Sequence, residues 1–447
     1  MKRALTHGPS LVWNPSVTPT KQTSWTRMSW WFMCLLFLAV FAMATPFNPW
    51  FSLTGNAGLS HSEAVAKIES GSLSRQVALT ALGAVGIAAL LFRRSRDRIE
   101  PNGVLGYVGI FFLVVSSLSV IVSDDIMFTA KRVIVLLTLT LGALAAAKRM
   151  NLREIITFSL CAGIFSLGAG FLCELACGTF TPFDGSYRFT GVMDANFQAT
   201  NCSMLLLAAV ASAHAAKRQQ TRLLYFAMAV ISFAFLVLTK SRTGMIGSVV
   251  GLLTYGGLVS PRKAVVCLLA VVYFVCAAYL ISAGDLGRFG NSMLTLGRTD
   301  IGDTGENLIT MTGRTNNWQT EVFPNIKGHL MLGYGYDSFW TASRVAALSE
   351  YELGSTHNGY LHTLLGLGLV GMTTYVLIRV LGIVAYFRLF KGSGNSEYCL
   401  ALALLVSFSL IITSIDVQLS PLLATFVDMV LLAKIATTAG RATDRWL

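Results

Sequence analysis

The chain has 447 residues, of which 54% are apolar and only 13% are charged, and its mean hydropathy is +0.62. Since about 25% of the residues of an ordinary soluble domain are charged, this composition excludes a soluble globular enzyme. The net charge of +12 would suggest nucleic-acid binding in a soluble chain. In a membrane protein, basic residues sort by membrane side instead, and we expect no nucleic-acid partner.

Apolar runs long enough to cross a bilayer as helices recur along the whole chain. We predict about twelve, which makes the protein an all-α, polytopic membrane protein. The first run resembles a cleavable signal peptide, but its long polar leader favours a retained anchor. In chain order the runs cover residues 29–45, 74–92, 103–122, 128–147, 154–176, 196–216, 221–239, 243–259, 263–283, 358–386, 397–415 and 420–439.

Lysine and arginine gather in alternate connections between these runs, which is the pattern of the positive-inside rule. This alternation places both termini and the basic connections in the cytoplasm. The basic connections include the groups Arg93–Arg98, Lys148–Arg153, Lys217–Arg222, Arg262–Lys263 and Arg388–Lys391.

One long polar connection, residues 284–356, divides the chain into an N-terminal membrane region (1–283, about nine spans) and a C-terminal one (357–447, about three spans). It lies on the side opposite the termini, and soluble chemistry would take place there. Helical spacing predicts a helix over Thr310–Phe323, ended by Pro324, and a second over Ser338–Glu352. We therefore expect a partly helical periplasmic segment.

Three short connections on that same side keep basic residues despite the cost of translocating them. For Lys131–Arg132 we favour snorkelling or pairing with Asp124–Asp125. Arg242 follows a connection so short that its flanking spans must form a tight hairpin. Its guanidinium, like that of Arg188, could either snorkel or bind phosphate oxygens as a bidentate fork, and the residue pattern leaves both open.

A histidine lies where the long connection meets the tenth span. With Ser355 or Thr356 as N-cap, His357 would lie in the first helical turn. The positive end of the helix dipole disfavours imidazolium there and leaves a neutral ring that can accept a proton. The alternative is an interfacial histidine without a catalytic role. His362 lies about 140° further round the helix and is expected to be a packed or capped residue.

Several of these pieces, in this order, resemble one family, the O-antigen ligases and their relatives among O-antigen polymerases. The resemblance covers roughly the second half of the chain, and the first half agrees in hydropathy and in Arg188. It rests on Ser241-Arg242-Thr243-Gly244, Gly313-Arg314 with Trp318, Pro324, Gly333-Tyr334-Gly335, His357-Asn358-Gly359-Tyr360-Leu361, and Gly366, Gly368 and Gly371.

The resemblance implies transfer of a glycan from undecaprenyl pyrophosphate to a hydroxyl of lipid A core. The reaction would take place at the periplasmic face of the bacterial inner membrane, among membrane lipids, with inversion at the anomeric carbon. The implied roles are general base for His357, pyrophosphate binding for Arg188 and Arg242 with assistance from Arg314, and support of these groups by Lys240, Asn358 and Tyr360.

Neither a cofactor nor a metal is expected, because no D-x-D pair occurs on the periplasmic side. The nearest alternative is an O-antigen polymerase, which uses the same donor, although two comparable periplasmic loops would suit a polymerase better than one large segment. A protein-glycosylating ligase is a further variant. A solute transporter is the alternative from another class, and against it the sequence suggests neither an intramembrane acid nor a pair of broken helices.

Overall fold

The computed structural model describes residues 34, 38, 73–91, 100–184, 187–260, 314–347, 355–415 and 423–437. These residues form helices and connections and contain no strand. Of the described helices, five are long and apolar enough to cross a membrane: Ile126–Arg149, Leu152–Cys177, Gln219–Leu238, Gly359–Ser393 and Ser396–Ser414. The chain is therefore an all-α membrane protein. Twelve spans remain a prediction, because the run at 263–283 and nearly all of the run at 29–45 lie outside the described residues.

Helix boundaries agree with the predicted spans to within a few residues at most ends. Local signals explain several of them. For example, a capping box between Asn151 and Glu154 begins α7, and Gly178, with a left-handed φ of 67°, ends it. The helices that correspond to predicted spans are α4 (Leu73–Leu91), α5 (Gly103–Leu118), α6 (Ile126–Arg149), α7 (Leu152–Cys177), α8 (Ala195–Ala215), α9 (Gln219–Leu238), α10 (Arg242–Val259), α17 (Gly359–Ser393), α18 (Ser396–Ile411) and α19 (Leu423–Thr437).

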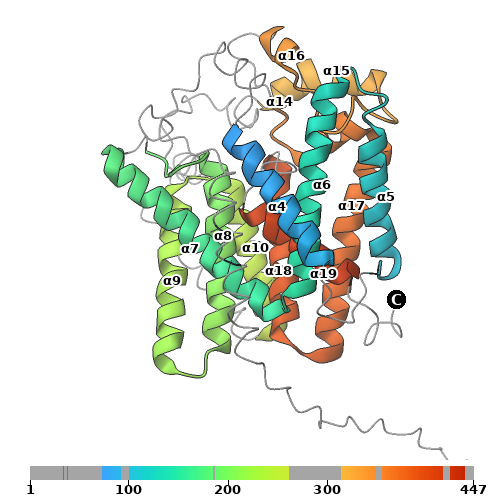
Figure 1. Cartoon of the computed structure of the whole chain (residues 1–447). Coiled ribbons are helices and arrows are strands. Elements are labelled where there is room, and N and C mark those ends of the chain that lie inside the picture. Colours follow the sequence, from blue (N-terminus) through green and yellow to red (C-terminus); the bar gives the residue numbers. More distant parts are fainter. Residues whose placement is uncertain are drawn as a thin grey trace, which may run out of the picture.

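Basic connections that the sequence assigns to one side meet at one end of the bundle. Arg153, Lys217 and Arg218 line a single cavity of about 570 Å³ together with the first turn of α18. The Lys434 ammonium donates hydrogen bonds to two backbone carbonyls at the α6–α7 connection. Figure 1 shows the α8–α9 and α17–α18 turns at this end and the short helices α14 (Arg314–Asn317), α15 (Phe323–Gly328) and α16 (Ala342–Ala347) at the opposite end.

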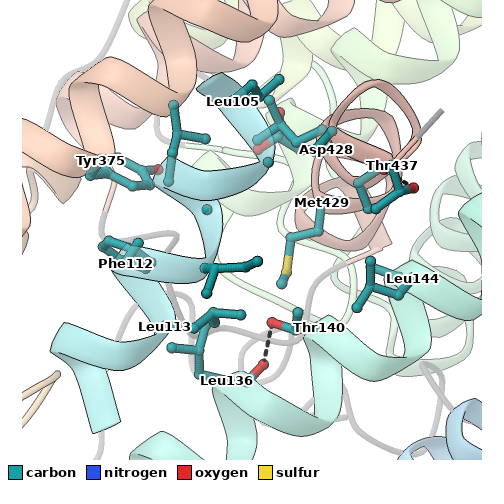
Figure 2. Close-up of a pocket in the computed structure, with 18 of the residues that line it drawn as sticks. Leu105, Phe112, Leu113, Leu136, Thr140, Leu144, Tyr375, Asp428, Met429 and Thr437 are labelled. Atoms are coloured by element: carbon teal, nitrogen blue, oxygen red, sulfur yellow. Dashed lines mark hydrogen bonds between the residues drawn. The ribbon is translucent and has the colours of Figure 1, made fainter. Parts of the chain in front are cut away.

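A mostly apolar cavity of about 360 Å³ lies between α5, α6, α17 and α19 (Figure 2). Its wall contains the ion pair between Arg379 of α17 and Asp428 of α19, which are 3% and 8% exposed. The expectation that no acid lies within the spans was therefore wrong. Hydropathy averaging missed Asp428 because a single carboxylate among apolar neighbours barely changes the mean of a window.

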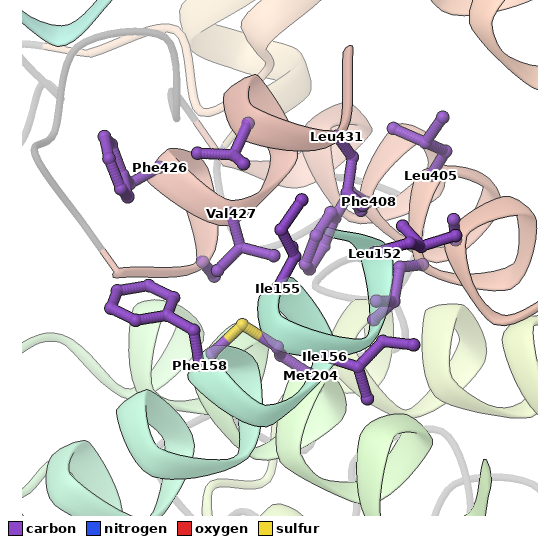
Figure 3. Packing of buried hydrophobic residues seen from close by; sticks show 14 of the residues in the cluster. Leu152, Ile155, Ile156, Phe158, Met204, Leu405, Phe408, Phe426, Val427 and Leu431 are labelled. Atoms are coloured by element: carbon purple, nitrogen blue, oxygen red, sulfur yellow. The ribbon is translucent and has the colours of Figure 1, made fainter. Parts of the chain in front are cut away.

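The other face of α19 packs into the main core with α7, α8 and α18. Figure 3 shows Phe158, Met204, Phe408 and Phe426 meeting from these four helices. Because lipid tails are as apolar as these side chains, close packing rather than burial from water holds such helices together. Glycines bring α10 close to its neighbours: a Cβ on Gly244 would lie 2.7 Å from Ala199 of α8, and one on Gly247 would lie 2.6 Å from Ile411 of α18.

The short helices differ from their prediction. Instead of ending at Pro324, helical structure continues from α14 through a π-helical turn (Trp318–Val322) into α15, which ends at Gly328. Proline is tolerated there because it stands in the first turn of α15. The second helix is the shorter α16 (Ala342–Ala347), and residues 348–352 lie outside the described part.

The tenth span is broken, which the apolar run did not indicate. Gly368 interrupts α17 with φ 63° and ψ −164°. The loop after α15 pairs with this break through backbone hydrogen bonds from Leu369 N–H to the Leu330 carbonyl (2.8 Å) and from Gly335 N–H to the Gly366 carbonyl (2.8 Å). Backbone groups freed by the break are satisfied in this way, as a membrane protein requires.

Candidate functional site

Arg188 lies in a short segment that one carboxylate holds in place. Glu174, 1% exposed at the end of α7, accepts hydrogen bonds from the backbone N–H groups of Thr190 (2.9 Å) and Gly191 (2.6 Å). The Tyr187 hydroxyl donates to the other carboxylate oxygen. Burial and this hydrogen bond raise the pKa of Tyr187, so its phenol stays protonated. The half-buried Arg188 is thus fixed between two anchored neighbours.

The same segment contacts the α9–α10 hairpin, which is as tight as the sequence predicts, with only Thr239–Ser241 between the two helices. Arg188 Nε donates to the Thr239 carbonyl (3.1 Å), and Phe189 N–H donates to the Leu238 carbonyl (2.8 Å). The half-buried Arg242 is the first residue of α10, two residues after Lys240, whose φ is 50°. The structure therefore brings Arg188, Lys240 and Arg242 to one turn.

His357 lies just before a helix rather than in its first turn. Asn358, not Ser355 or Thr356, is the N-cap of α17: its side-chain oxygen accepts hydrogen bonds from the N–H groups of Tyr360 and Leu361. His357 is half-buried, and its backbone is left-handed with φ 47°. Such a conformation is uncommon for a residue other than glycine and is concentrated at functional sites.

The segment that begins with Arg314 supports the chain before this histidine. Trp318 Nε1 donates to the Thr356 carbonyl (2.8 Å), and Asn317 Nδ2 donates to the Ser355 carbonyl (2.9 Å). Arg314 starts α14 one turn before Trp318. The helical part of the long connection is therefore hydrogen-bonded to the last residues of the same connection, directly before His357.

The end of α18 connects the two groups of residues. Val192 and Met193, which follow the Arg188 segment, form one apolar cluster with Ile411, Ile412 and Ile415. The side chain of Tyr360 packs against the same cluster, and a Cβ on Gly359 would lie 2.7 Å from Ile412. Both the arginine-bearing hairpin and the histidine-bearing helix start thus border residues 411–415 at one end of the bundle.

A further group of polar side chains, Arg132, Asp337 and His362, lies at the same end of the bundle. The sequence did not suggest this group. Asp337 carries one carboxylate oxygen 3.3 Å from Arg132 Nε and the other 2.5 Å from His362 Nε2. As expected, His362 is buried (7% exposed). Of the two expectations for Arg132, snorkelling or pairing with a nearby acid, the structure shows pairing, but with Asp337 and not with Asp124 or Asp125, because Asp124 pairs with Arg344 and Asp125 caps α6. The partners come from α6, from the loop before α16 and from α17, so no local pattern could reveal the group.

The side chains at this end of the bundle have the chemistry that phosphate binding and proton acceptance need. Guanidinium groups offer forked donors for phosphate oxygens, and an imidazole can take a proton from a hydroxyl near neutral pH. In the described part of the chain, no group of three His, Cys, Asp or Glu side chains is arranged to hold a metal ion. Sequence reasoning missed Glu174, Asp337 and Arg132 as supports, and only the buried position of an acid at the end of α7 could have indicated the first.

Comparison with known proteins identifies part of this framework. Residues 227–376 match the family model described as O-antigen ligase. The match runs from within α9 into the first half of α17 and includes Arg242, Arg314 and His357, whereas Arg188 precedes it. None of the curated proteins compared with the chain matches it.

Proposed function

Because residues 227–376 match the O-antigen ligase family model, we propose that the chain belongs to the O-antigen ligase/polymerase family and that it is an O-antigen ligase. The reaction transfers a glycan from undecaprenyl pyrophosphate to a hydroxyl of lipid A core. The observation that carries the proposal is the position of Arg188, Arg242 and His357 around one end of α18. Guanidinium groups for the pyrophosphate and an imidazole for the proton are the groups that we expect this transfer to use.

Each side chain has a role that follows from its chemistry. His357 accepts the proton of the acceptor hydroxyl as its oxygen forms a bond to the anomeric carbon, and the bond from that carbon to the pyrophosphate breaks. Attack from the opposite face inverts the anomeric configuration. Arg188 and Arg242, assisted by Arg314, stabilise the charge on the departing pyrophosphate, at about 1.5–3 kcal/mol per charge-assisted hydrogen bond. Lys240, Asn358 and Tyr360 support these groups.

The pyrophosphate is itself a good leaving group, so the reaction needs neither ATP nor, in this proposal, a metal or other cofactor. The site faces the periplasm, and both termini are on the cytoplasmic side of the inner membrane. Within this arrangement, residues 1–283 and 357–447 are the membrane regions, and residues 284–356 form the periplasmic segment.

An O-antigen polymerase is the nearest alternative, because it uses the same donor and differs in its acceptor. The single long connection favours the ligase. A solute transporter is the weaker alternative. The buried Asp428 and the break at Gly368 remove two arguments against it, but the match of residues 227–376 to the O-antigen ligase family model opposes it.

The central experiment is a reconstituted transfer assay with purified protein and undecaprenyl pyrophosphate-linked glycan. His357→Ala is expected to lower the rate by about two to four orders of magnitude, the usual contribution of a general base. Arg242→Lys should also lose most activity, because an ammonium cannot form the bidentate fork. The matched control is His329→Ala, which removes an exposed histidine from the same end and should retain full activity. Normal transfer by folded His357→Ala protein would remove the assigned base.

Assays with two different acceptors distinguish a ligase from a polymerase. Complete lipid A core should be glycosylated, whereas a second lipid-linked repeat should be elongated only if the protein is a polymerase. A parallel sample treated exhaustively with chelator should keep its activity. Loss of activity that added Mg²⁺ or Mn²⁺ restores would refute the metal-independent mechanism.

A further inference from the structure

The cavity between α5, α6, α17 and α19 begins beneath the candidate site. Tyr336, next to Asp337, and Ile412, which borders Gly359, both line it. Hydrogen bonds to Ser409 also connect the cavity wall to the candidate site. Arg379 Nε, in the wall, donates to the Ser409 hydroxyl (3.1 Å), and the Tyr360 hydroxyl, at the site, donates to the Ser409 carbonyl (3.1 Å). The cavity and the site thus share a wall.

From there the cavity runs along the membrane-spanning helices. It follows α19 from Thr425 to Thr437, a rise of about 18 Å at 1.5 Å per residue. Figure 2 shows Leu113, Leu136, Leu144 and Met429 around it. With a volume of about 360 Å³, it is within the usual size range of a ligand pocket. Its shape and lining suit a flexible apolar chain lying along the bilayer normal.

The charged part of the wall, Arg379 and Asp428, lies toward the site, where Arg379 donates to Ser409. Within the described part of the chain, Arg379 Nη2, Thr425 Oγ1 and Asp428 Oδ1 are buried without a hydrogen-bond partner. Buried polar atoms without partners are costly, so these three require hydrogen-bonding groups such as bound water, which an apolar chain does not supply. Because Arg379 and Asp428 neutralise each other, the cavity does not attract a pyrophosphate. It suits the apolar chain just below a polar headgroup.

We propose that this cavity binds the part of the donor's polyprenyl chain nearest the pyrophosphate, with the pyrophosphate above it at the arginines. The inference rests on the proposed function for the identity of the lipid. It assigns the path of the chain to the space between α5, α6, α17 and α19, and it makes cavity-lining residues determinants of donor binding.

Gly109 of α5 provides a direct test. It lines the cavity, and a Cβ at this position meets no atom within 4 Å, so Gly109→Phe fills the space without a backbone clash. The matched control is Gly168→Phe in α7, where a Cβ also meets nothing within 4 Å. Gly109→Leu, with a smaller side chain, is the second variant if the phenylalanine variant unfolds.

Binding of undecaprenyl phosphate, which carries no glycan, is measured by native mass spectrometry on protein from nanodiscs of phosphatidylethanolamine and phosphatidylglycerol. Gly109→Phe should raise the apparent Kd at least about tenfold, and Gly168→Phe should match the parent protein. Unchanged binding by folded Gly109→Phe and Gly109→Leu protein overturns the proposal. So does loss of co-purified phospholipid without loss of undecaprenyl phosphate, because the cavity would then hold an ordinary acyl chain.

The transfer assay separates this proposal from the proposed function. If the parent protein transfers glycan and Gly109→Phe raises KM for the long-chain donor but not for a short-chain donor, both stand. If no acceptor is glycosylated but Gly109→Phe still weakens undecaprenyl phosphate binding, the cavity assignment stands and the ligase proposal fails.

Discussion

Glu174 shows how a single buried side chain fixes the backbone of a segment that carries a candidate site residue. It receives four hydrogen bonds from residues 187–191, and these fix the backbone on both sides of Arg188. A carboxylate buried at the end of a membrane helix is expensive unless it is satisfied in this way. Arg188 is recognisable in the sequence as a basic residue in a connection on the predicted periplasmic side. The carboxylate that holds its segment lies 14 residues earlier, in another element.

We expect Glu174→Gln to weaken this segment. The amide keeps one acceptor oxygen but points donor hydrogens at existing donors, and hydrogen bonds to a charged group contribute about 1.5–3 kcal/mol. The variant should unfold at a lower temperature in a thermal scan and should show a higher KM for the donor. Tyr187→Phe, which removes one bond only, should show a smaller effect on both. Parent-like values for Glu174→Gln would mean that the carboxylate does not position Arg188.

At the scale of elements, α17 is a membrane span whose helix is interrupted at Gly368, and its amino-acid composition does not reveal the interruption. Residues on both sides of Gly368 are apolar, so hydropathy predicts one continuous run. The break exists because the loop after α15 approaches the helix backbone: a Cβ on Gly368 would lie 2.2 Å from the Met331 carbonyl carbon, and one on Gly333 would lie 2.4 Å from that of Gly366. Two glycines from distant parts of the chain allow this approach.

Gly368→Ala is therefore expected to destabilise the protein. The added methyl group would enter the backbone of Met331, and the positive φ costs a residue other than glycine about 1–3 kcal/mol. The matched control is Gly257→Ala in α10, where the Cβ meets nothing within 4 Å and the helix gains propensity. Thermal unfolding should show a clear decrease for the first and no decrease for the second. Equal unfolding temperatures would mean that the loop does not pack against the break.

For the whole molecule, the distribution of charge predicts which end faces the cytoplasm. The cavity lined by Arg153, Lys217 and Arg218 and the Lys434 contacts lie at one end, and the residues of the candidate site lie at the other. The negative surface of the cytoplasmic leaflet attracts such basic groups.

Cysteine labelling tests this orientation. In a background without native cysteines, Phe183→Cys replaces a fully exposed residue between α7 and α8, and Gly392→Cys lies at the exposed end of α17. A membrane-impermeant maleimide should label Phe183→Cys in right-side-out vesicles and Gly392→Cys only in inverted ones. The reverse pattern would place the candidate site in the cytoplasm and contradict the proposed reaction.

The sequence by itself determined the membrane class, the positions of most spans, the grouping of basic connections and the motifs around Arg242 and His357. Each of these depends on local hydropathy, charge or short-range spacing. Only the tertiary structure decided how Glu174 holds Arg188, how Asp337 joins Arg132 to His362, and where α17 breaks. It alone showed Arg379 and Asp428 paired in the wall of a cavity. Those features depend on contacts between residues far apart in the chain, and no window along the sequence contains both partners.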